Sequence, residues 1–336
     1  MDKRTVTGII IAATLGIFPA AAFFYCVTMS RKAANAQTAP LHAFRPQFQI
    51  MGTVAAFTLY CSNEETFKTA AAAGIKEFEK VSRLANLYNK TSELSRLNAS
   101  AYNQPFSCSE AMWQLLTRAE RAFYDSNGGF DITVKPLMDL WGFYRKRKTV
   151  PSTGEIASAK AKVGFTLLKL DHARRTVQFS VPGMALDLGG IAKGYALDLA
   201  FEAVTACGVT CGVLDLGGNL KLLPDPPSGK KFYTVGIKNP ADTSELLQTE
   251  IRLPGNSAVS TSGDYERFVV IGSRRYGHII DPRTGSPAPA NAVTVTTVSA
   301  MDADIFSTTA YLEGESGAGK LRASYPGTKF YFTYTK

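Results

Sequence analysis

One stretch near the middle of the chain constrains its fold most strongly, Asp187-Leu-Gly-Gly-Ile-Ala-Lys-Gly-Tyr-Ala-Leu-Asp198. It follows the apolar segment Val181–Leu186 and leads into Leu197–Val204, which has helical spacing. We therefore expect a strand, a tight Gly-Gly turn and a helix that begins near Ile191. The start of a helix presents unpaired N–H groups and a positive dipole end to an anion, and adjacent glycines let the backbone approach a ligand closely. Taken alone, the pattern is explained most simply by a structural strand-to-helix turn.

The composition of the chain is that of a globular protein. Its 336 residues are 45% hydrophobic and 19% charged. The formal net charge of +9 suits an anionic small molecule or an acidic partner. No run of Lys and Arg is interleaved with aromatic residues, which argues against nucleic-acid binding. The composition therefore leaves small anions and acidic proteins as the favoured partners.

The N-terminus indicates export. A run from Gly8 to Met29 contains no charged residue and is long enough to span a bilayer core of about 30 Å as a helix. A small-x-small cleavage site is present at Ala34-Asn-Ala36, but Arg31 and Lys32 precede it, where a cleavable signal rarely carries charge. We expect an uncleaved anchor in the inner membrane, with the globular part facing the periplasm.

These observations predict three parts: residues 1–32 as a membrane anchor or signal segment, residues 33–46 as a linker, and residues 47–336 as one folded domain. The linker is small, polar and contains Pro40. Lipidation at Cys26 is disfavoured, because the preceding Phe23-Phe-Tyr25 does not resemble a lipoprotein cleavage site. The processing of this segment stays open.

Four further cysteines would belong to the exported domain. In an oxidising compartment, a bridge between Cys61 and Cys108, or between Cys207 and Cys211, is compatible with the sequence. The spacing establishes neither pair. The chain has three histidines and none stands near a cysteine, so a zinc site is not expected.

The order of elements predicts an α+β protein, with mixed sheets and flanking helices. Apolar spacing predicts helices over residues 64–88, 109–125, 191–207 and 302–312, with 316–323 a further helical candidate. Strand composition marks residues 48–60 (interrupted at 51–53), 165–186, 211–216, 231–237, 248–253, 267–272, 292–298 and 329–334. We interpret residues 89–98 as a loop with one short helical turn. No regular βαβ rhythm and no internal repeat is present.

Two groups of side chains suggest chemistry. Asp304 and Thr308 stand four residues apart, so on a helix they point the same way, and a carboxylate with a hydroxyl suits Mg²⁺. On spacing alone, a capping aspartate and a buried threonine explain them better. His278 lies among turn-forming polar residues, where it is either a general base or an ordinary loop histidine.

The sequence Gly314–Lys320 resembles a phosphate loop, but Leu321 replaces the Ser or Thr that would hold magnesium.

Several stretches together resemble one family, the ApbE-like FAD:protein FMN transferases. They occur in the family's order from about residue 48 to the C-terminus: Met51-Gly-Thr53, Ser92-Glu-Leu-Ser-Arg-Leu-Asn98, Gly128-Gly-Phe-Asp-Ile-Thr133, Leu140-Trp-Gly-Phe143, Asp187–Asp198, Thr261-Ser-Gly-Asp-Tyr-Glu-Arg267, His278-Ile-Ile-Asp-Pro-Arg-Thr-Gly285 and Ala303–Thr308. The resemblance implies an ApbE-like fold of intertwined α/β subdomains. It also implies Mg²⁺-dependent transfer of FMN from FAD to a threonine hydroxyl of a protein, with release of AMP.

The resemblance further implies roles for individual residues. Mg²⁺ would be held by Asp304, Thr308 and the carbonyl of Gly190, and His278 would take the proton from the acceptor threonine. The residues that would surround FAD are Met51, Tyr88, Gly129, Phe130, Asp131, Asp187, Lys193 and Ile280. The implied acceptor is a subunit of a membrane redox complex, such as a sodium-pumping NADH:quinone reductase, that carries an Asp-Gly-x-Thr-Gly-Ala-Ser/Thr sequence.

Two features depart from the family pattern, and two other functions compete with transfer. Glu313 stands where the family helix is usually apolar, and Cys207 and Cys211 are not part of the pattern. The same site would serve an FAD pyrophosphatase, in which water replaces the threonine. An exported flavin-binding or flavin-storage protein without turnover is the third hypothesis, although the presence of Asp304, Thr308 and His278 argues against it.

Overall fold

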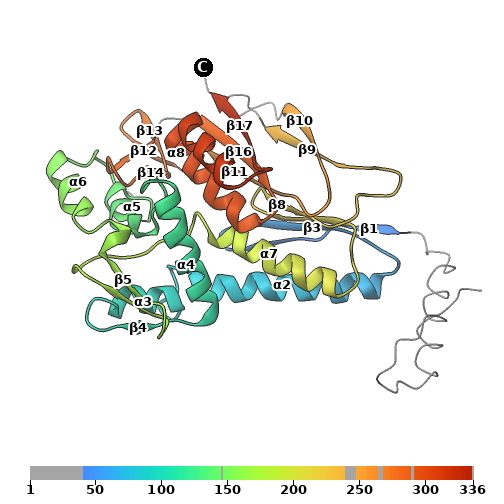
Figure 1. The fold of residues 1–336 in the computed structure, drawn as a ribbon, viewed down its shortest axis with the longest axis horizontal. Helices are drawn as coiled ribbons and strands as arrows, with labels where there is room; N and C mark the ends of the chain where they lie inside the picture. The colour runs from blue at the N-terminus through green and yellow to red at the C-terminus, as the bar shows by residue number, and fades with distance from the viewer. Residues whose placement is uncertain (1–40, 145–146, 239–246, 264–267, 289–290, 335–336) are drawn as a thin grey trace, which may run out of the picture. The chain divides into compact units, whose positions relative to one another are not determined.

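A computed structural model describes residues 41–144, 147–238, 247–263, 268–288 and 291–334 (Figure 1). Residues Leu41–Lys336 form one compact unit. The anchor predicted over residues 1–32 lies outside the described residues. Within the described ranges, no helix combines the length and the apolar character that crossing a membrane requires.

The largest sheet has eight strands, and all of its pairings are antiparallel. Its strand order is β1-β3-β7-β8-β11-β16-β17, with β2 also pairing with β3. The strands are β1 (His42–Phe44), β2 (Gln47–Ile50), β3 (Thr53–Cys61), β7 (Gly212–Leu216), β8 (Asn219–Leu222), β11 (Ala258–Gly263), β16 (Asn291–Thr297) and β17 (Lys329–Tyr334). The strand β1 lies within the linker predicted over residues 33–46, so ordered pairing begins before residue 47.

Three long helices pack with this sheet: α2 (Glu64–Ala85), α7 (Ala192–Ala206) and α8 (Ala300–Ser324). A Cβ at Gly74 of α2 would lie 3.0 Å from Phe57 of β3 and 3.0 Å from Val204 of α7. The glycine therefore allows α2 to approach both elements closely. Phe57 and Phe78 are fully buried in this core, and burial of each such side chain stabilises the fold by about 1.5–3 kcal/mol.

A second group of elements lies between α2 and α7 in the sequence (Figure 1). It contains α3 (Glu93–Ser100), α4 (Glu110–Asp125), α5 (Lys135–Trp141), α6 (Thr153–Lys160), the 3-10 turns η1 (Ile132–Val134) and η2 (Phe165–Leu167), and the sheet β4-β6-β5 (Phe106–Ser107, Thr176–Phe179, Leu168–Asp171). Three two-stranded ribbons complete the fold: β9 (Tyr233–Lys238) with β10 (Leu247–Leu253), β12 (Phe268–Ile271) with β13 (Arg274–Gly277), and β14 (Ile280–Asp281) with β15 (Ser286–Pro287).

The α+β class with mixed sheets and flanking helices is confirmed. The interruption predicted at residues 51–53 is a tight hairpin turn, because Met51 (φ 51°) and Gly52 (φ 73°) are both left-handed. The loop predicted over residues 89–98 is wrong in part. Its second half is helix α3, whose N-cap Ser92 accepts a hydrogen bond from Ser95 N.

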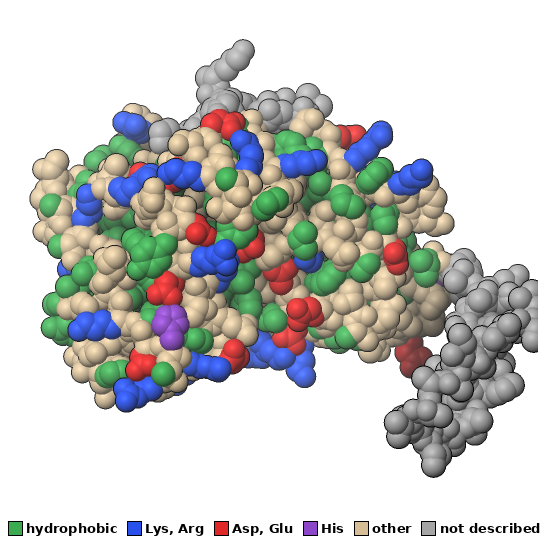
Figure 2. Space-filling view, in the orientation of Figure 1, with side chains coloured by type: hydrophobic (Ala, Val, Ile, Leu, Met, Phe, Trp, Pro, Cys, Tyr) green, Lys and Arg blue, Asp and Glu red, His purple; other side chains and the backbone are tan. Residues whose placement is uncertain are grey.

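The two helical segments predicted near the C-terminus form a single element, α8, with a kink at Gly314 (φ 64°, ψ −152°). The Gly314–Lys320 stretch therefore lies within this helix, and only Gly314 departs from helical geometry. Neither disulfide considered from the sequence is present, because Cys61, Cys108, Cys207 and Cys211 are free thiols. On the face drawn in Figure 2, described Lys and Arg side chains are interspersed with Asp and Glu.

Candidate active site

Asp304 lies at the centre of the site and is held by three different elements. Its side chain is on the first half of α8, and the residue is only 4% exposed. One carboxylate oxygen accepts a hydrogen bond from the backbone N–H of Gly194 at 3.0 Å. The other accepts from Asn219 Nδ2 at 2.9 Å and lies 3.5 Å from Ser260 Oγ. A buried carboxylate with this many donors is fixed in one orientation.

Thr308 stands one helical turn after Asp304 on the same face of α8. Its hydroxyl donates to the Asp304 carbonyl at 3.2 Å and lies 3.3 Å from Ser262 Oγ. A Cβ added at Gly190 would lie 3.3 Å from Thr308 Oγ1. The Gly-Gly turn, Asp304 and Thr308 therefore meet, although more than a hundred residues separate the turn from the helix.

These groups fit a magnesium ion. A carboxylate, a hydroxyl and a backbone carbonyl are hard oxygen ligands, which Mg²⁺ prefers, with water or phosphate at its other positions. Among the residues that the structure describes, no three His, Cys, Asp or Glu side chains gather as a metal site. A metal held by Asp304, Thr308 and the Gly190 carbonyl would keep positions for a phosphate ligand or water.

The approach of α7 to α8 brings the groups together. A Cβ at Gly194 would fall 2.2 Å from the Ala300 carbonyl oxygen, so a glycine is required there. Asp198 caps the start of α8, because its carboxylate accepts from Ser299 Oγ at 2.8 Å and from the N–H groups of Ala300 and Met301 at 2.9 and 3.0 Å. It also pairs with the buried Lys221 at 3.2 Å.

The strand predicted before the Gly-Gly turn is not present, because β6 ends at Phe179 and residues 184–188 have no regular secondary structure. Asp187 lies two residues before Gly189 and is held by its own contacts. Its backbone N–H donates to Ile132 O at 2.7 Å, and its carboxylate accepts from Gly189 N at 2.7 Å and from the Tyr144 hydroxyl. The Tyr144 ring lies edge-on to Tyr88, with centroids 5.9 Å apart. Tyr88 is 72% exposed, so an aromatic face is available beside the Asp187 carboxylate.

Phe130 and its neighbours lie against the turn from the other side. A Cβ at Gly190 would lie 3.2 Å from the Phe130 ring, and one at Gly129 would lie 2.6 Å from Glu313 Oε1. Asp131 is buried, and its carboxylate accepts from Thr133 N, Thr133 Oγ1 and Phe165 N at 2.8, 2.7 and 3.0 Å. Burial raises the pKa of Asp131, and these hydrogen bonds act in the opposite direction. Its contacts are thus internal to the fold.

Lys193 and Met51 lie near a second pair of glycines. The Gly217-Gly218 turn between β7 and β8 is left-handed at both residues, and Gly217 N donates to Val54 O at 2.9 Å, beside the Met51 hairpin. Gly218 N donates to Asp215 Oδ1 at 2.9 Å. Burial raises the pKa of Asp215, and the Lys193 ammonium opposes this shift, so Lys193 and Asp215 are close enough to interact.

His278 is half-buried at the bend between β13 and β14. Ile280, two residues later, is 4% exposed and packs in a small core with Trp141 and Leu137. The following turn is joined to α8, because Arg283 Nη1 donates to Glu313 Oε1 at 3.0 Å. Burial raises the pKa of Glu313, and Arg283 opposes this shift. The His278 segment therefore contacts the helix that carries Asp304.

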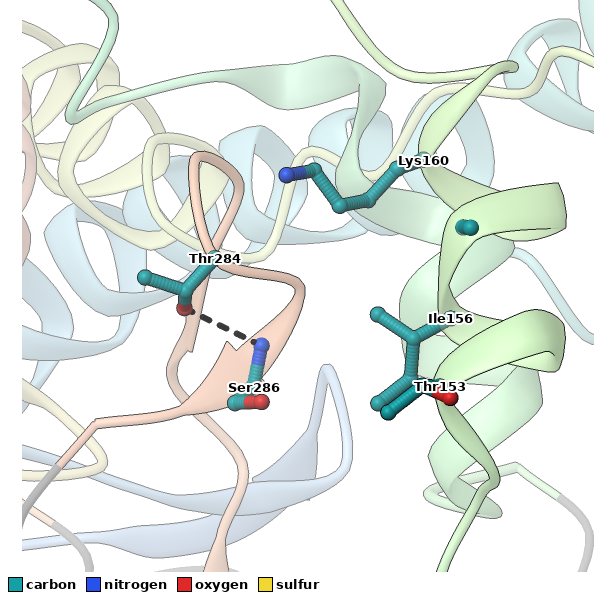
Figure 3. A pocket seen from close by; sticks show the side chains of 6 residues that line it. Thr153, Ile156, Lys160, Thr284 and Ser286 are labelled. Carbon is teal, nitrogen blue, oxygen red and sulfur yellow. Dashed lines mark hydrogen bonds between the residues drawn. The ribbon is translucent and has the colours of Figure 1, made fainter.

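An open cleft lies beside this turn (Figure 3). Thr153, Ile156 and Lys160 of α6 face Thr284 and Ser286 across it, and Thr284 Oγ1 accepts from Ser286 N at 3.2 Å. None of the residues that the sequence selected as site residues lines this cleft. It is thus separate from the groups around Asp304.

The structure brings Asp304, Thr308, Gly190 and Phe130 into direct proximity, and it joins Asp187 to Tyr88 through Tyr144. Ile280 has core contacts, and Asp131 accepts three hydrogen bonds from within the fold. Their proposed role beside FAD stays a prediction, as do the other site assignments.

The sequence analysis missed the residues that orient Asp304. These are Asn219 and Ser260, which contact its carboxylate. Ser307 Oγ lies 3.2 Å and 2.9 Å from the hydroxyls of Ser260 and Ser262, and although Ser262 and Ser307 lie in stretches named in the sequence analysis, no role was assigned to them. The available signal was the alternation Ser260-Thr-Ser262, because residues two apart on a strand share one face. Nothing local in the sequence links that strand to α8.

The fold and the site define an α+β protein in which a Gly-Gly turn and one helix carry a cluster of hard oxygen ligands. The sequence model of the ApbE family matches residues 51–332. The chain belongs to the ApbE family.

Curated relatives are similar to this chain in sequence. The FAD:protein FMN transferase of Salmonella typhimurium is 34% identical over 227 residues, which cover 66% of this chain and 64% of that protein. That of Klebsiella pneumoniae is 32% identical over 228 residues, covering 66% and 65%. The chain thus spans 64% and 65% of the lengths of these two relatives.

Two solved structures are also similar. The ApbE protein of Thermotoga maritima has a TM-score of 0.79 and 29% identity, covering 87% of this chain and 94% of that one. The flavin transferase ApbE of Vibrio cholerae has a TM-score of 0.74 and 28% identity, covering 88% and 98%. The ApbE-like fold expected from the sequence is confirmed.

Proposed function

We propose that this chain is a Mg²⁺-dependent FAD:protein FMN transferase, which moves FMN from FAD to a threonine hydroxyl of a protein and releases AMP. The observation that carries the proposal is the meeting of Gly190, Asp304 and Thr308. This cluster offers oxygen ligands beside a glycine turn at the start of a helix. Relatives of similar sequence bear the name FAD:protein FMN transferase.

The chain's own groups suit a pyrophosphate substrate. The start of α7 presents a positive dipole end, which favours an anion, and Lys193 in its first turn adds a cation. Tyr88 supplies an exposed aromatic face, which suits stacking on a planar ring. When bound by Asp304, Thr308 and the Gly190 carbonyl, Mg²⁺ would neutralise charge on the pyrophosphate.

The reaction is a displacement at phosphorus. The acceptor hydroxyl oxygen forms a bond to the phosphorus of the FMN half, and the bond from that phosphorus to the bridging oxygen breaks. AMP leaves with the bonding electron pair. An imidazole nitrogen of His278 takes the hydroxyl proton, since an unperturbed histidine can accept a proton near neutral pH. Such chemistry depends mainly on positioning and charge stabilisation, so few side chains are needed.

The acceptor and the location are part of the same proposal. The acceptor carries an Asp-Gly-x-Thr-Gly-Ala-Ser/Thr sequence and belongs to a membrane redox complex such as a sodium-pumping NADH:quinone reductase. The apolar run Gly8–Met29 supports an inner-membrane anchor, with the folded domain in the periplasm beside that complex.

The test incubates the full chain with FAD, Mg²⁺ and a purified subunit that carries the acceptor sequence. The expected result is a covalently fluorescent acceptor, with one AMP released for each flavin attached and no labelling of an acceptor whose threonine is replaced by valine. Release of FMN and AMP at the same rate without acceptor would instead establish an FAD pyrophosphatase. Tight FAD binding without AMP release would establish a flavin-binding protein.

A further inference from the structure

The turn that follows His278 is closed by its own acidic residue. Gly285 N donates to the Asp281 carbonyl at 2.8 Å. The Asp281 carboxylate accepts from the backbone N–H of Arg283 at 2.8 Å, and from its Nε and Nη2 at 2.9 and 3.0 Å. The Arg283 guanidinium is therefore fixed against the turn, with Nη1 directed away from Asp281.

Nη1 of Arg283 reaches a buried carboxylate on α8. It donates to Glu313 Oε1 at 3.0 Å, and the Glu313 side chain is 8% exposed, against 42% for Arg283. An ion pair at an exposed surface contributes little, but a buried carboxylate depends strongly on its partner. The ion pair therefore restricts the position of the Glu313 carboxylate as well as that of the Arg283 guanidinium.

The space for Glu313 is created by two glycines. A Cβ at Gly129 would lie 2.6 Å from Glu313 Oε1, and one at Gly317 would lie 2.7 Å from Oε2. The carboxylate thus lies between the backbone next to Phe130, the turn at Arg283 and the second half of α8. Glu313 immediately precedes the kink at Gly314.

We propose that Glu313 is a positioning residue that holds the His278 segment in register with the Asp304–Thr308 face of α8. The inference rests on the proposed function, because it takes His278 as the group that accepts the proton. Glu313 touches neither substrate nor metal in this account. It acts through Arg283, by fixing where the turn and the preceding His278 lie relative to the helix.

Two further contacts keep the turn folded without Glu313. Lys160 Nζ donates to the Arg283 carbonyl at 2.5 Å, and Trp141 Nε1 donates to the Gly285 carbonyl at 2.8 Å. Both donors come from the α5–α6 region and neither comes from α8. Loss of Glu313 therefore removes the ion pair between the turn and α8 and leaves these two contacts in place.

The test compares Glu313→Met, which has similar length and no charge, with Glu313→Gln, which keeps an acceptor oxygen for Arg283. We expect Glu313→Met to lower kcat about tenfold with KM for FAD changed less than about threefold, which is the signature of lost orientation. Glu313→Gln should restore most of kcat. The control is Glu315→Gln, whose exposed carboxylate pairs with Arg322 at 3.3 Å on the same helix, and it should behave as wild type.

The double variant Arg283→Met/Glu313→Met separates orientation from stability. It removes both partners of the pair but leaves the Asp281 carboxylate only the backbone N–H of residue 283. We therefore expect it to be less stable than Glu313→Met while kcat is no lower than in that variant. A wild-type kcat in Glu313→Met, or a raised KM for FAD with unchanged kcat, would overturn the proposal.

A measurement that needs no transfer activity distinguishes this proposal from the proposed function. Amide hydrogen exchange over residues 278–288 should be about tenfold faster in Glu313→Met than in wild type or Glu315→Gln. If the wild type transfers no flavin, the proposed function fails. If exchange in this segment is unchanged, the link through Glu313 fails, whatever reaction the chain catalyses.

Discussion

The Asp304 carboxylate accepts a hydrogen bond from the backbone N–H of Gly194 at 3.0 Å, and this bond joins α8 to the first turn of α7. Gly194 belongs to the Gly-Gly turn motif, and Asp304 belongs to the acidic motif near the C-terminus. Each motif is a weak sequence signal alone, and this contact brings the two motifs together in one site. It also predicts that changes at either residue affect stability and activity together.

Asp304→Asn should weaken both the fold and the reaction. An amide can accept at only one of its two positions, so its NH₂ group would face either Gly194 N–H or Asn219 Nδ2. We expect a loss of about 1–3 kcal/mol in the free energy of unfolding, and a fall in kcat of about 100-fold or more. Urea unfolding and the transfer assay measure these effects.

The control for this variant is Asp139→Asn, where a half-exposed carboxylate pairs with Lys135. It should change the free energy of unfolding by less than about 0.5 kcal/mol. If Asp304→Asn matches that control in both stability and activity, the role given to Asp304 is wrong.

Gly194→Ala should push α7 and α8 apart. The new methyl group would lie 2.2 Å from the Ala300 carbonyl oxygen and 2.6 Å from Met301 Cα, and backbone cannot move aside cheaply. We expect a destabilisation of about 1–3 kcal/mol, measured by thermal or urea unfolding. Gly319→Ala is the matched control on α8, because nothing lies within 4 Å of its added methyl group. It should stabilise the protein by about 0.5–1 kcal/mol, and equal effects of the two changes would contradict the account.

Gly190→Ala should disturb the site more than the fold. Its methyl group would meet the Phe130 ring at 3.2 Å and Thr308 Oγ1 at 3.3 Å, distances that small side-chain shifts relieve. We expect an unfolding free energy within about 1 kcal/mol of wild type, and a rate about tenfold lower, which corresponds to about 1.4 kcal/mol in the barrier. Gly154→Ala, whose methyl group meets nothing within 4 Å, should leave the rate unchanged. A wild-type rate in Gly190→Ala would show that this turn does not contribute to the reaction.

Stability should fall with rising pH in a window set by Asp131. Burial raises the pKa of this carboxyl above its ordinary value of 3.8. Between 3.8 and the raised value, the unfolded chain has lost the proton while the folded protein still holds it. The unfolded state therefore binds fewer protons, and the free energy of unfolding decreases as pH rises through this window.

Asp131→Asn should flatten this dependence, because the amide does not titrate. The variant should be less stable overall, since its NH₂ group replaces an acceptor for Phe165 N or Thr133 N. Urea unfolding of both proteins at pH values from 4 to 7 tests the sign. An identical slope in the two proteins would show that Asp131 does not set this part of the pH profile.

The elements that could be predicted from sequence are those with a strong local pattern. Helix α2 has a continuous apolar face and a matching N-cap at Asn63, and β17 has the predicted bounds of residues 329–334. Helix α6 was missed, although Ser152 and Glu155 form a capping box at its start. Its eight residues have one buried side chain, Ala159, so the apolar spacing used to find helices was absent.

The motifs of the site could be predicted from the sequence, whereas the residues that orient them could not. Asp304, Thr308 and Gly190 lie in recognisable stretches, whereas Asn219 and Ser260 come from neighbouring strands that contact α8 only after the sheet forms. The pairing of Arg283 with Glu313 likewise depends on a turn and a helix brought together by tertiary packing. A single sequence carries no local signal for such contacts.

The most direct test of the account measures covalent flavin transfer against Mg²⁺ concentration for wild type, Thr308→Ser and Thr308→Val. Serine keeps the hydroxyl that lies 3.2 Å from the Asp304 carbonyl and 3.3 Å from Ser262 Oγ, whereas valine keeps the shape and removes the oxygen. The account predicts near wild-type Mg²⁺ dependence for Thr308→Ser, and about a tenfold or greater rise in the half-saturating Mg²⁺ concentration for Thr308→Val. A folded Thr308→Val protein with the Mg²⁺ dependence and rate of wild type would contradict it.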